Sequence, residues 1–258
     1  MTTPPRLVAF DLDDTLAPSK SPLDPEMAEL LVRLLDVVDV CVISGGQIAQ
    51  FEMQLIDNLQ GASDQALERL HLMPTCGTQY YRHEDGAWNQ VYAQNLTDDE
   101  KQRALEAVER VARELGFWET KTWGPILEDR GSQITFSALG QSAPVSEKVA
   151  WDPTGAKKNA LREAVQAELP DLEVRSGGST SVDITRQGID KAYGMKKLAE
   201  MTGIPLTDML FVGDRLDPDG NDYPVKALGV ECFAVEGWHD TAAYVENLIP
   251  QLQAAAAR

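Results

Sequence analysis

The segment Asp11-Leu12-Asp13-Asp14-Thr15 places carboxylates directly after an apolar run, Leu7–Phe10. Residues two apart on an extended backbone share a face, so Asp11 and Asp13 can both point into one site. Paired carboxylates can bind a divalent cation, or one can attack a substrate while the other moves protons. A solvated acidic turn is the alternative. The position after a buried strand, at the sheet edge where open α/β folds bind ligands, favours a chemical site.

Three further segments place ion-binding groups at comparable positions. Ser44-Gly45-Gly46 precedes a predicted helix, so its hydroxyl and backbone N–H groups could bind an anion, although most such turns only connect elements. Lys191 lies near another helix start, where a single lysine is usually solvated. Gly213–Asp222 offers five potential oxygen ligands in ten residues, which suits a hard cation, but it lacks the spacing and the terminal Glu of an EF-hand.

The elements that carry these segments predict an α/β core. Short apolar runs with the character of buried strands alternate with helix signals, which is typical of a parallel sheet covered on both faces. Asp24 followed by Pro25 marks one helix start. The predicted core strands are Leu7–Phe10, Val40–Ile43, Met209–Val212 and Cys232–Val235.

The middle of the chain has a different, α+β pattern. A hairpin is predicted around Tyr80–Val91, and Thr97 with Glu100 forms a capping box that opens a long helix ending at Gly116. Further elements are predicted at 133–137, 155–169 and 181–185 before the α/β rhythm returns at Lys191. We therefore expect a core made of residues 1–82 and 187–258, with an inserted domain at 83–186.

Composition limits the possible functions. The chain has 258 residues, 43% hydrophobic and 25% charged, as expected of a globular protein. It has no apolar run of roughly 20 residues and no signal-peptide pattern, so we expect a cytoplasmic protein without a membrane partner. A net charge of −18 argues against nucleic acid as a partner but not against small phosphorylated ligands, because a metal ion and a few cations can dominate the field of a pocket.

Cys41, Cys76 and Cys232 are widely spaced and sit among apolar or small neighbours, so we expect buried thiols. A zinc site is excluded by the absence of a cluster of cysteines with histidines in the sequence.

Four features in chain order resemble the four motifs of the haloacid dehalogenase superfamily: Asp11-x-Asp13-x-Thr15, Ser44, Lys191 and Gly213-Asp214…Asn221-Asp222. The resemblance implies a Rossmann-like core with a parallel sheet flanked by helices. It also implies that Asp11 attacks phosphorus and forms an aspartyl phosphate. Asp13 would protonate the leaving group and then deprotonate water or a second acceptor.

The same resemblance implies a Mg²⁺ cofactor, without which a carboxylate could hardly approach a phosphate dianion. The implied cation ligands are carboxylates of the two acidic segments and one backbone carbonyl: Asp11, Asp13 through its carbonyl, Asp214, and Asp222 in support. The implied phosphate ligands are Ser44, Gly45 and Lys191, of which Lys191 is also counted as catalytic. The insertion at 83–186 corresponds to the α+β (C2-type) cap of the superfamily's second class, subclass IIB, which closes over the core and excludes water.

Within that class the chain looks most like the eukaryotic-type α-phosphomannomutase group. The stretches that carry the likeness are Arg130-Gly131-Ser132…Ser137-Ala138-Leu139-Gly140, Gly177-Gly178-Ser179-Thr180-Ser181-Val182-Asp183 and Gly188-Ile189-Asp190-Lys191. The resemblance implies that Arg130, Ser181 and Asp183 contact a hexose phosphate. The alternative is that these are a surface arginine with an exposed serine and aspartate.

Two departures from that group affect the expected reaction. Gln141 stands where the group has a second arginine, and Asp14 stands where glycine is common. Because glutamine cannot hold a distal phosphate by charge, we expect a sugar-phosphate phosphatase that needs Mg²⁺. The alternative is a phosphomannomutase that interconverts mannose 1-phosphate and mannose 6-phosphate through a hexose bisphosphate. A binding module without catalysis is disfavoured by the intact acidic and basic set, and an oligomer remains open.

Overall fold

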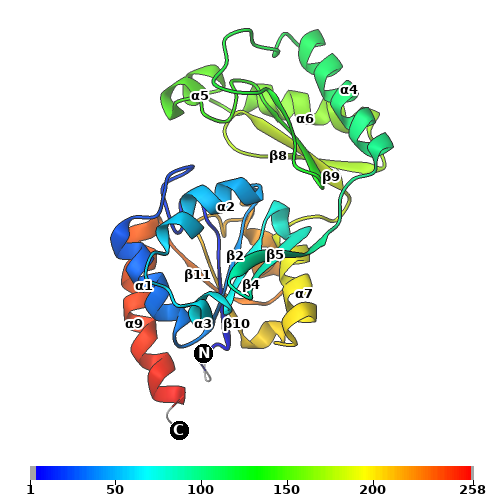
Figure 1. The fold of residues 1–258 in the computed structure, drawn as a ribbon. Coiled ribbons are helices and arrows are strands. Elements are labelled where there is room, and N and C mark those ends of the chain that lie inside the picture. The colour runs from blue at the N-terminus through cyan, green and yellow to red at the C-terminus, as the bar shows by residue number, and fades with distance from the viewer. Residues whose placement is uncertain (1–3, 257–258) are drawn as a thin grey trace. The chain divides into compact units, whose positions relative to one another are not determined.

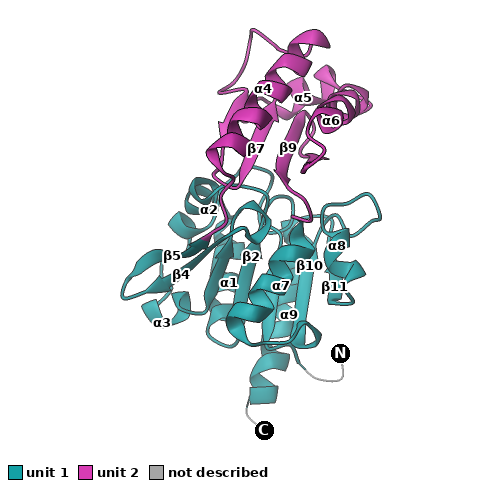
Figure 2. Cartoon of the chain, turned by 90° about the vertical axis from the view of Figure 1, so that its right-hand side faces the viewer, with its two compact units in different colours: residues 1–92, 190–258 teal, residues 93–189 magenta. Residues whose placement is uncertain are grey.

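The computed structural model describes residues 4–256, which divide into two compact units (Figure 2). The first unit contains the described residues up to Tyr92 and those from Asp190 onward. The second unit is Ala93–Ile189. One continuous stretch of chain thus forms the second unit, while the first is assembled from the two flanking stretches.

The first unit is built on a seven-stranded sheet of order β11-β10-β1-β2-β3-β4-β5 (Figure 1). The five strands from β11 to β3 run parallel, and β4 pairs with β3 antiparallel. The strands are β1 (Leu7–Phe10), β2 (Asp39–Ile43), β3 (Leu70–Met73), β4 (Gln79–Glu84), β5 (Ala87–Ala93), β10 (Met209–Gly213) and β11 (Glu231–Ala234).

Helices cover both faces of this sheet, because successive strand residues point to opposite faces. Val8 and Phe10 of β1 pack in one apolar cluster with residues of α1 (Pro25–Leu35) and α9 (Trp238–Ala256). Leu7 and Ala9 pack in another with residues of α7 (Lys191–Thr202) and α8 (Tyr223–Ala227). All four residues of β1 are fully buried, which explains why the strand reads as a continuous apolar run.

Shorter elements complete the first unit. They are α2 (Ile48–Gln54), α3 (Asp64–Leu67) and the 3₁₀ turns η1 (Ile56–Asn58), η2 (Thr75–Gly77) and η3 (Leu206–Asp208). Helix α1 begins as its sequence predicts: Asp24 accepts a hydrogen bond from the backbone N–H of Glu26, and Pro25 occupies the first turn, where no intrahelical donor is needed.

The second unit is a four-stranded antiparallel sheet of order β6-β7-β9-β8 with three helices. Its elements are α4 (Asp98–Glu114), β6 (Leu127–Asp129), β7 (Gln133–Ser137), α5 (Val145–Trp151), α6 (Ala156–Glu168), β8 (Leu172–Ser176) and β9 (Ser181–Arg186). Ile134 and Phe136 of β7 pack with apolar residues of α4 and α6. Gln133, Thr135 and Ser137 alternate with them, so the other face of the sheet is polar.

The expected fold class is confirmed: a parallel-dominated α/β sheet with flanking helices, interrupted by an α+β unit. The expected hairpin forms as β4 and β5, but it extends the sheet of the first unit. Leu72 of β3 is paired with Tyr81 of β4, so the hairpin is hydrogen-bonded to the strand before it. The second unit accordingly begins at Ala93 and ends at Ile189, ten residues after the expected start at 83 and three after the expected end at 186.

Two local expectations have different outcomes. Cys41 is buried as expected, whereas the prediction of buried thiols is wrong for Cys76 and Cys232, which are partly exposed. Cys76 lies in η2, the turn after β3, and Cys232 lies on the edge strand β11, so neither is enclosed on all sides. No helix in the described part of the chain has the length and apolar character to cross a membrane.

Candidate active site

Asp11, Lys191 and Asp222 meet at the carboxyl edge of the parallel sheet. The Nζ atom of Lys191 lies 2.7 Å from Oδ1 of Asp11 and 2.6 Å from Oδ1 of Asp222. Asp11 follows β1 and Asp222 lies in the loop after β10, and β1 and β10 are paired neighbours. All three side chains are buried. Residues about 200 positions apart in the sequence thus form one charged cluster.

Lys191 is buried because of its place at the first turn of α7. Asp190 caps this helix by accepting a hydrogen bond from the backbone N–H of Tyr193, so Lys191 is the first helical residue. Its side chain is 1% exposed. A buried ammonium is tolerated only when it is paired, and the two carboxylates provide that pairing.

The charges of this cluster shift one another's protonation. Burial raises the pKa of Asp11 to about 7, although Lys191 lowers it, and Asp222 adds to the rise. Burial lowers the pKa of Lys191, but the two carboxylates outweigh that effect and raise it. Burial, followed by the charge of Asp222, raises the pKa of Asp214. The site is therefore short of positive charge, and another cation would favour the ionised carboxylates.

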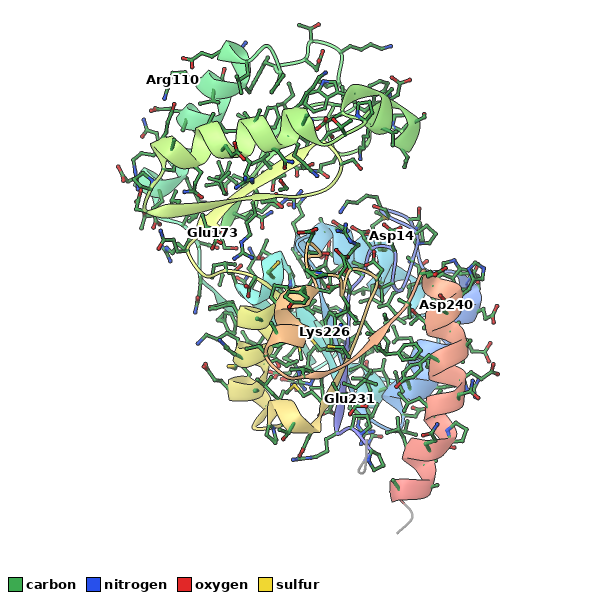
Figure 3. The ribbon with its side chains drawn as sticks, turned by 180° about the vertical axis from the view of Figure 1, so that it is seen from behind. Asp14, Arg110, Glu173, Lys226, Glu231 and Asp240 are labelled. Carbon is green, nitrogen blue, oxygen red and sulfur yellow. The ribbon has the colours of Figure 1, made fainter. Side chains whose placement is uncertain are left out.

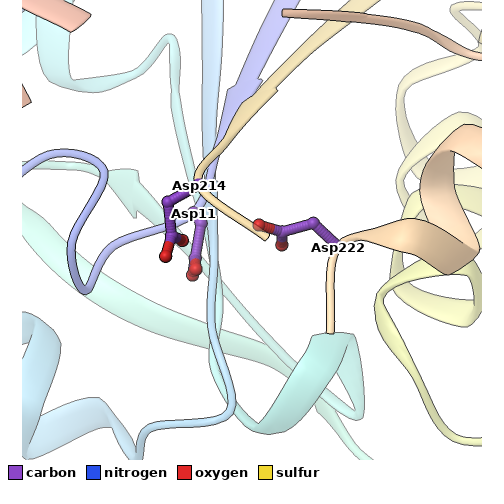
Figure 4. A group of neighbouring side chains, drawn as sticks. All are labelled: Asp11, Asp214 and Asp222. Carbon is purple, nitrogen blue, oxygen red and sulfur yellow. The ribbon is translucent and has the colours of Figure 1, made fainter. Parts of the chain in front are cut away.

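The donor set fits a hard divalent cation such as Mg²⁺. Carboxylate oxygens of Asp11, Asp214 and Asp222 lie within 4.8 Å of one another, and Figure 4 shows the three side chains converging. Oxygen ligands are those that Mg²⁺ prefers. Both oxygens of Asp222 already accept hydrogen bonds, from Lys191 and from the backbone N–H of Arg215, which suits the supporting role expected for it. The hydroxyl of Thr15 donates to Oδ1 of Asp214 at 3.3 Å.

Asp13 lies outside this carboxylate group, and other side chains hold it. Its Oδ2 accepts hydrogen bonds from Nζ of Lys20 at 2.8 Å and Nε2 of Gln50 at 3.0 Å. Its Oδ1 accepts from the backbone N–H of Lys20 and from Nε2 of Gln54. Burial alone would raise the pKa of Asp13, but the charge and hydrogen bonds of Lys20 outweigh it and lower the pKa. The carboxylate of Asp13 is thus held ionised, and a metal role would fall to its backbone carbonyl.

Asp14, labelled in Figure 3, has a left-handed backbone with φ +59°. This conformation explains why glycine is common here in the group that the sequence resembles. Aspartate is among the few other residues that adopt it readily, and Oδ1 of Asp14 also accepts a hydrogen bond from the backbone N–H of Ser19. The unusual residue therefore leaves the loop intact.

Ser44 follows β2, the other neighbour of β1, as the sequence predicts. Its side chain is buried, and its Oγ accepts a hydrogen bond from the backbone N–H of Gly46 at 3.2 Å. The Ser44–Gly46 loop in turn accepts backbone hydrogen bonds from Thr75 and Cys76. The sequence reasoning did not identify these two residues, nor Lys20, Gln50 and Gln54.

The second unit places the expected sugar-binding residues on the polar face of its sheet. The hydroxyl of Thr135 donates to Oδ1 of Asp183 at 2.7 Å, and the hydroxyls of Ser137 and Ser181 lie 3.0 Å apart. Nε2 of Gln141 donates to Oγ of Ser137 at 2.5 Å. Hydroxyl, carboxylate and amide groups gathered on one face are suited to binding sugar hydroxyls.

Arg130 is held by an acidic side chain of the same unit. Its side chain is 7% exposed and forms an ion pair with Glu128, with Nη2 and Oε2 2.6 Å apart. Lys148 is a further cation of this unit that sequence reasoning missed, and its Nζ donates to the backbone carbonyl of Gln141 at 2.9 Å. A lysine on an otherwise exposed helix has no distinctive sequence signal.

Comparisons with known proteins agree with this architecture. The profile of the eukaryotic phosphomannomutase family matches residues 27–251. The chain is 26% identical over 261 residues to a probable phosphomannomutase of Caenorhabditis elegans, covering 95% of this chain and 96% of that one. It is 25% identical over 227 residues to phosphomannomutase 1 of Homo sapiens, covering 86% and 83% of the two chains.

Solved structures support the fold. A haloacid dehalogenase-like hydrolase from Bacteroides thetaiotaomicron matches with a TM-score of 0.63 at 16% identity, covering 94% of this chain and 99% of that one. A truncated IMP-nucleotidase of Plasmodium falciparum matches with a TM-score of 0.70 at 14% identity, covering 95% and 70%.

Proposed function

This chain belongs to the eukaryotic phosphomannomutase family, within the haloacid dehalogenase superfamily of phosphoryl-transfer enzymes, and from that premise we propose that it is a hexose-phosphate mutase. It moves a phosphoryl group between two hydroxyls of a hexose, with mannose 1-phosphate and mannose 6-phosphate as the expected pair. The observation that carries the proposal is the buried contact of Asp11 with Lys191, in a group of three carboxylates suited to a cation.

In the first step, an oxygen of Asp11 attacks one phosphorus of a hexose 1,6-bisphosphate, and the bond from that phosphorus to the sugar oxygen breaks, which leaves an aspartyl phosphate and a hexose monophosphate. Asp13 gives its proton to the leaving oxygen, for which it must first leave Lys20 and take up a proton. The ammonium of Lys191 and the hydroxyl of Ser44 hold the phosphoryl oxygens and offset their charge. In the second step, a free hydroxyl of a hexose monophosphate attacks the phosphorus of the aspartyl phosphate, and the bond from phosphorus to the Asp11 oxygen breaks, which forms the bisphosphate again. The proton of that hydroxyl passes to Asp13, and Asp11 is regenerated.

The carboxylates at the sheet edge would hold Mg²⁺ through Asp11, Asp214 and the carbonyl of Asp13, with Asp222 in support. When bound, Mg²⁺ would supply positive charge that allows the anionic nucleophile and the phosphate to approach each other. Lys191 reduces the same repulsion from the protein side, because it contacts Asp11 directly.

The second unit is the substrate-binding cap in this proposal. Ser181 and Asp183 would bind sugar hydroxyls. Arg130 would bind the second phosphate, because a guanidinium can donate two parallel hydrogen bonds to phosphate oxygens. The match to the family profile includes this unit as well as the core. The two phosphomannomutase relatives described above align with this chain over most of their length. This support favours the mutase over the phosphatase expected from Gln141 alone.

Hydrolysis is the second candidate, favoured by the uncharged side chain of Gln141. Its amide donates to Ser137, so it carries no charge for a distal phosphate. Arg130, the cation expected to bind the second phosphate, is paired with Glu128, which offsets its charge. A weakly held bisphosphate would leave Asp11 phosphorylated with the sugar gone, and water could then remove the phosphoryl group.

One experiment separates the two reactions. Mannose 1-phosphate is incubated with the protein, Mg²⁺ and a trace of hexose 1,6-bisphosphate, and ³¹P NMR follows mannose 6-phosphate and inorganic phosphate together. A mutase forms mannose 6-phosphate faster than inorganic phosphate and needs the bisphosphate. Release of phosphate alone, without need for the bisphosphate, would overturn the mutase in favour of the phosphatase.

Two variants sharpen this test. Asp11→Asn should abolish both products, whereas Asp57→Asn, at an exposed aspartate away from the sheet edge, should retain them. Gln141→Arg should raise the ratio of isomerisation to hydrolysis, because it adds a cation for the distal phosphate. An unchanged ratio of isomerisation to hydrolysis would mean that Gln141 does not influence the choice between the two reactions.

A further inference from the structure

Thr75, Cys76 and Gly77 adopt left-handed backbone conformations in succession, with φ of +48°, +55° and +83°. We call these three residues the left-handed turn. A non-glycine residue in this region costs about 1–3 kcal/mol, and the branched side chain of Thr75 makes the conformation especially unfavourable. Such a conformation persists only where surrounding contacts fix it. The contacts of these three residues therefore indicate the role of the conformation.

The left-handed turn is hydrogen-bonded to the Ser44–Gly46 loop. The backbone N–H of Cys76 donates to the carbonyl of Ser44 at 2.9 Å, and the N–H of Thr75 donates to the carbonyl of Gly46 at 2.9 Å. The turn therefore holds both ends of the loop that carries Ser44. An extended conformation at 75–77 would redirect these N–H groups and release the loop.

The other side of the left-handed turn packs directly on α7, backbone against backbone. A Cβ added to Gly77 would lie 2.5 Å from Cα of Gly194. A Cβ added to Gly194 would lie 2.7 Å from the carbonyl oxygen of Cys76 and 2.3 Å from Cδ1 of Ile43. Gly194 is one helical turn after Lys191. No side chain fits between the turn and the helix.

We propose that the left-handed turn is a positioning element that fixes Ser44 relative to Lys191. This inference rests on the proposed function, in which both residues hold the transferred phosphoryl group. The turn reaches Ser44 through two backbone hydrogen bonds and reaches the first turn of the Lys191 helix through a glycine–glycine contact. Strain at Thr75 and Cys76 thus sets the width of the phosphate site, while Asp11 and Asp222 are carried by the segments that follow β1 and β10.

The test is Gly194→Ala, measured by phosphate and Mg²⁺ binding through ligand-induced shifts of the unfolding midpoint and through calorimetry. The added methyl must displace the Cys76 carbonyl, because backbone cannot rotate away as a side chain can. We expect the dissociation constant for inorganic phosphate, measured with Mg²⁺ present, to rise about tenfold or more. The dissociation constant for Mg²⁺ alone should stay within about twofold of the native value.

Gly203→Ala is the matched control. Gly203 ends the same helix with φ +68°, and a Cβ there would meet no atom within 4 Å. Its replacement should lower the unfolding midpoint and leave phosphate binding unchanged. The double variant Gly194→Ala with Ile43→Val relieves the contact with Ile43 but not that with Cys76. Recovery of phosphate binding in the double variant would show a packing effect and overturn the proposal.

A second pair of variants covers the case in which Gly194→Ala fails to fold. Asparagine tolerates the left-handed region and valine does not, so Cys76→Asn should keep phosphate affinity and Cys76→Val should lose it. Equal affinity in the two variants would contradict the proposal. Ser44→Ala distinguishes a wrong phosphate site from a wrong positioning role. If Ser44→Ala keeps its phosphate affinity, the proposed phosphate site is wrong. If Ser44→Ala loses phosphate affinity but Gly194→Ala does not, only the positioning role is refuted.

Discussion

Replacing Lys191 by methionine removes the ammonium that contacts both Asp11 and Asp222 and keeps a side chain of similar length. The side chains of Lys191 and Asp222 are 1% and 0% exposed, so water cannot take over the lost contacts. Removing one partner of a buried ion pair costs about 3–5 kcal/mol, because the other charge remains buried. Little of this cost comes from a cavity, since methionine fills most of the space. We expect the free energy of unfolding of the first unit to fall by that amount in the absence of divalent cations.

Urea unfolding followed by circular dichroism measures this loss, with Lys196→Met as the control on an exposed position of the same helix. The control should change the free energy by less than about 0.5 kcal/mol. Saturating Mg²⁺ should stabilise Lys191→Met more than it stabilises the native protein, because the cation replaces part of the missing charge. A loss below about 1 kcal/mol in Lys191→Met would contradict a buried ion pair here, because it would mean that the carboxylates are neutral or solvated without the lysine.

Three further predictions concern the cation, the pH dependence and the second unit. Asp214→Asn should raise the Mg²⁺ concentration for half-maximal turnover by about tenfold or more, and an unchanged requirement would exclude Asp214 as a ligand. Burial, with a smaller effect of Arg82, lowers the pKa of His71 to about 3. Below pH 6.5 the unfolded chain therefore binds a proton that the folded chain does not, and stability falls by roughly 2 kcal/mol between pH 7 and 5. His71→Phe should remove that part of the fall, and an identical pH profile would contradict it. Thr97→Ala removes the cap of α4 and should cost the second unit about 1 kcal/mol in thermal unfolding, whereas no shift would show that the cap contributes nothing.

The meeting of Asp11, Ser44 and Asp214 at one edge could be predicted, because each follows a strand and the carboxyl ends of parallel strands lie together. The alternation of Leu7–Phe10 between the two apolar clusters also follows from strand geometry. Both features follow from apolar runs that predict strands and from the two-residue alternation of strand side chains, which can be recognised in the sequence itself.

The features that escaped prediction depend on contacts distant in sequence. Gln50 and Gln54 lie four residues apart on α2 and so share a face, but uncharged amides give no sign that they hold Asp13. The sequence of the hairpin is compatible with either unit. Only the pairing of β4 with β3 shows that it belongs to the first unit. The left-handed conformation of Thr75 could not be predicted from the sequence either, since threonine normally avoids it.

The pairing of β1 with β10 also determines the order in which the chain can fold during synthesis. Leu7 pairs with Met209, so about 200 residues separate the partners. At roughly 5–20 residues per second, a ribosome takes about 10–40 s to cover that interval. The contiguous second unit is complete within this time, while β1 still lacks its partner along one edge. An unpaired apolar strand is prone to associate with other chains. The nascent first unit therefore exposes one edge of β1 until β10, in about the last fifth of the chain, emerges.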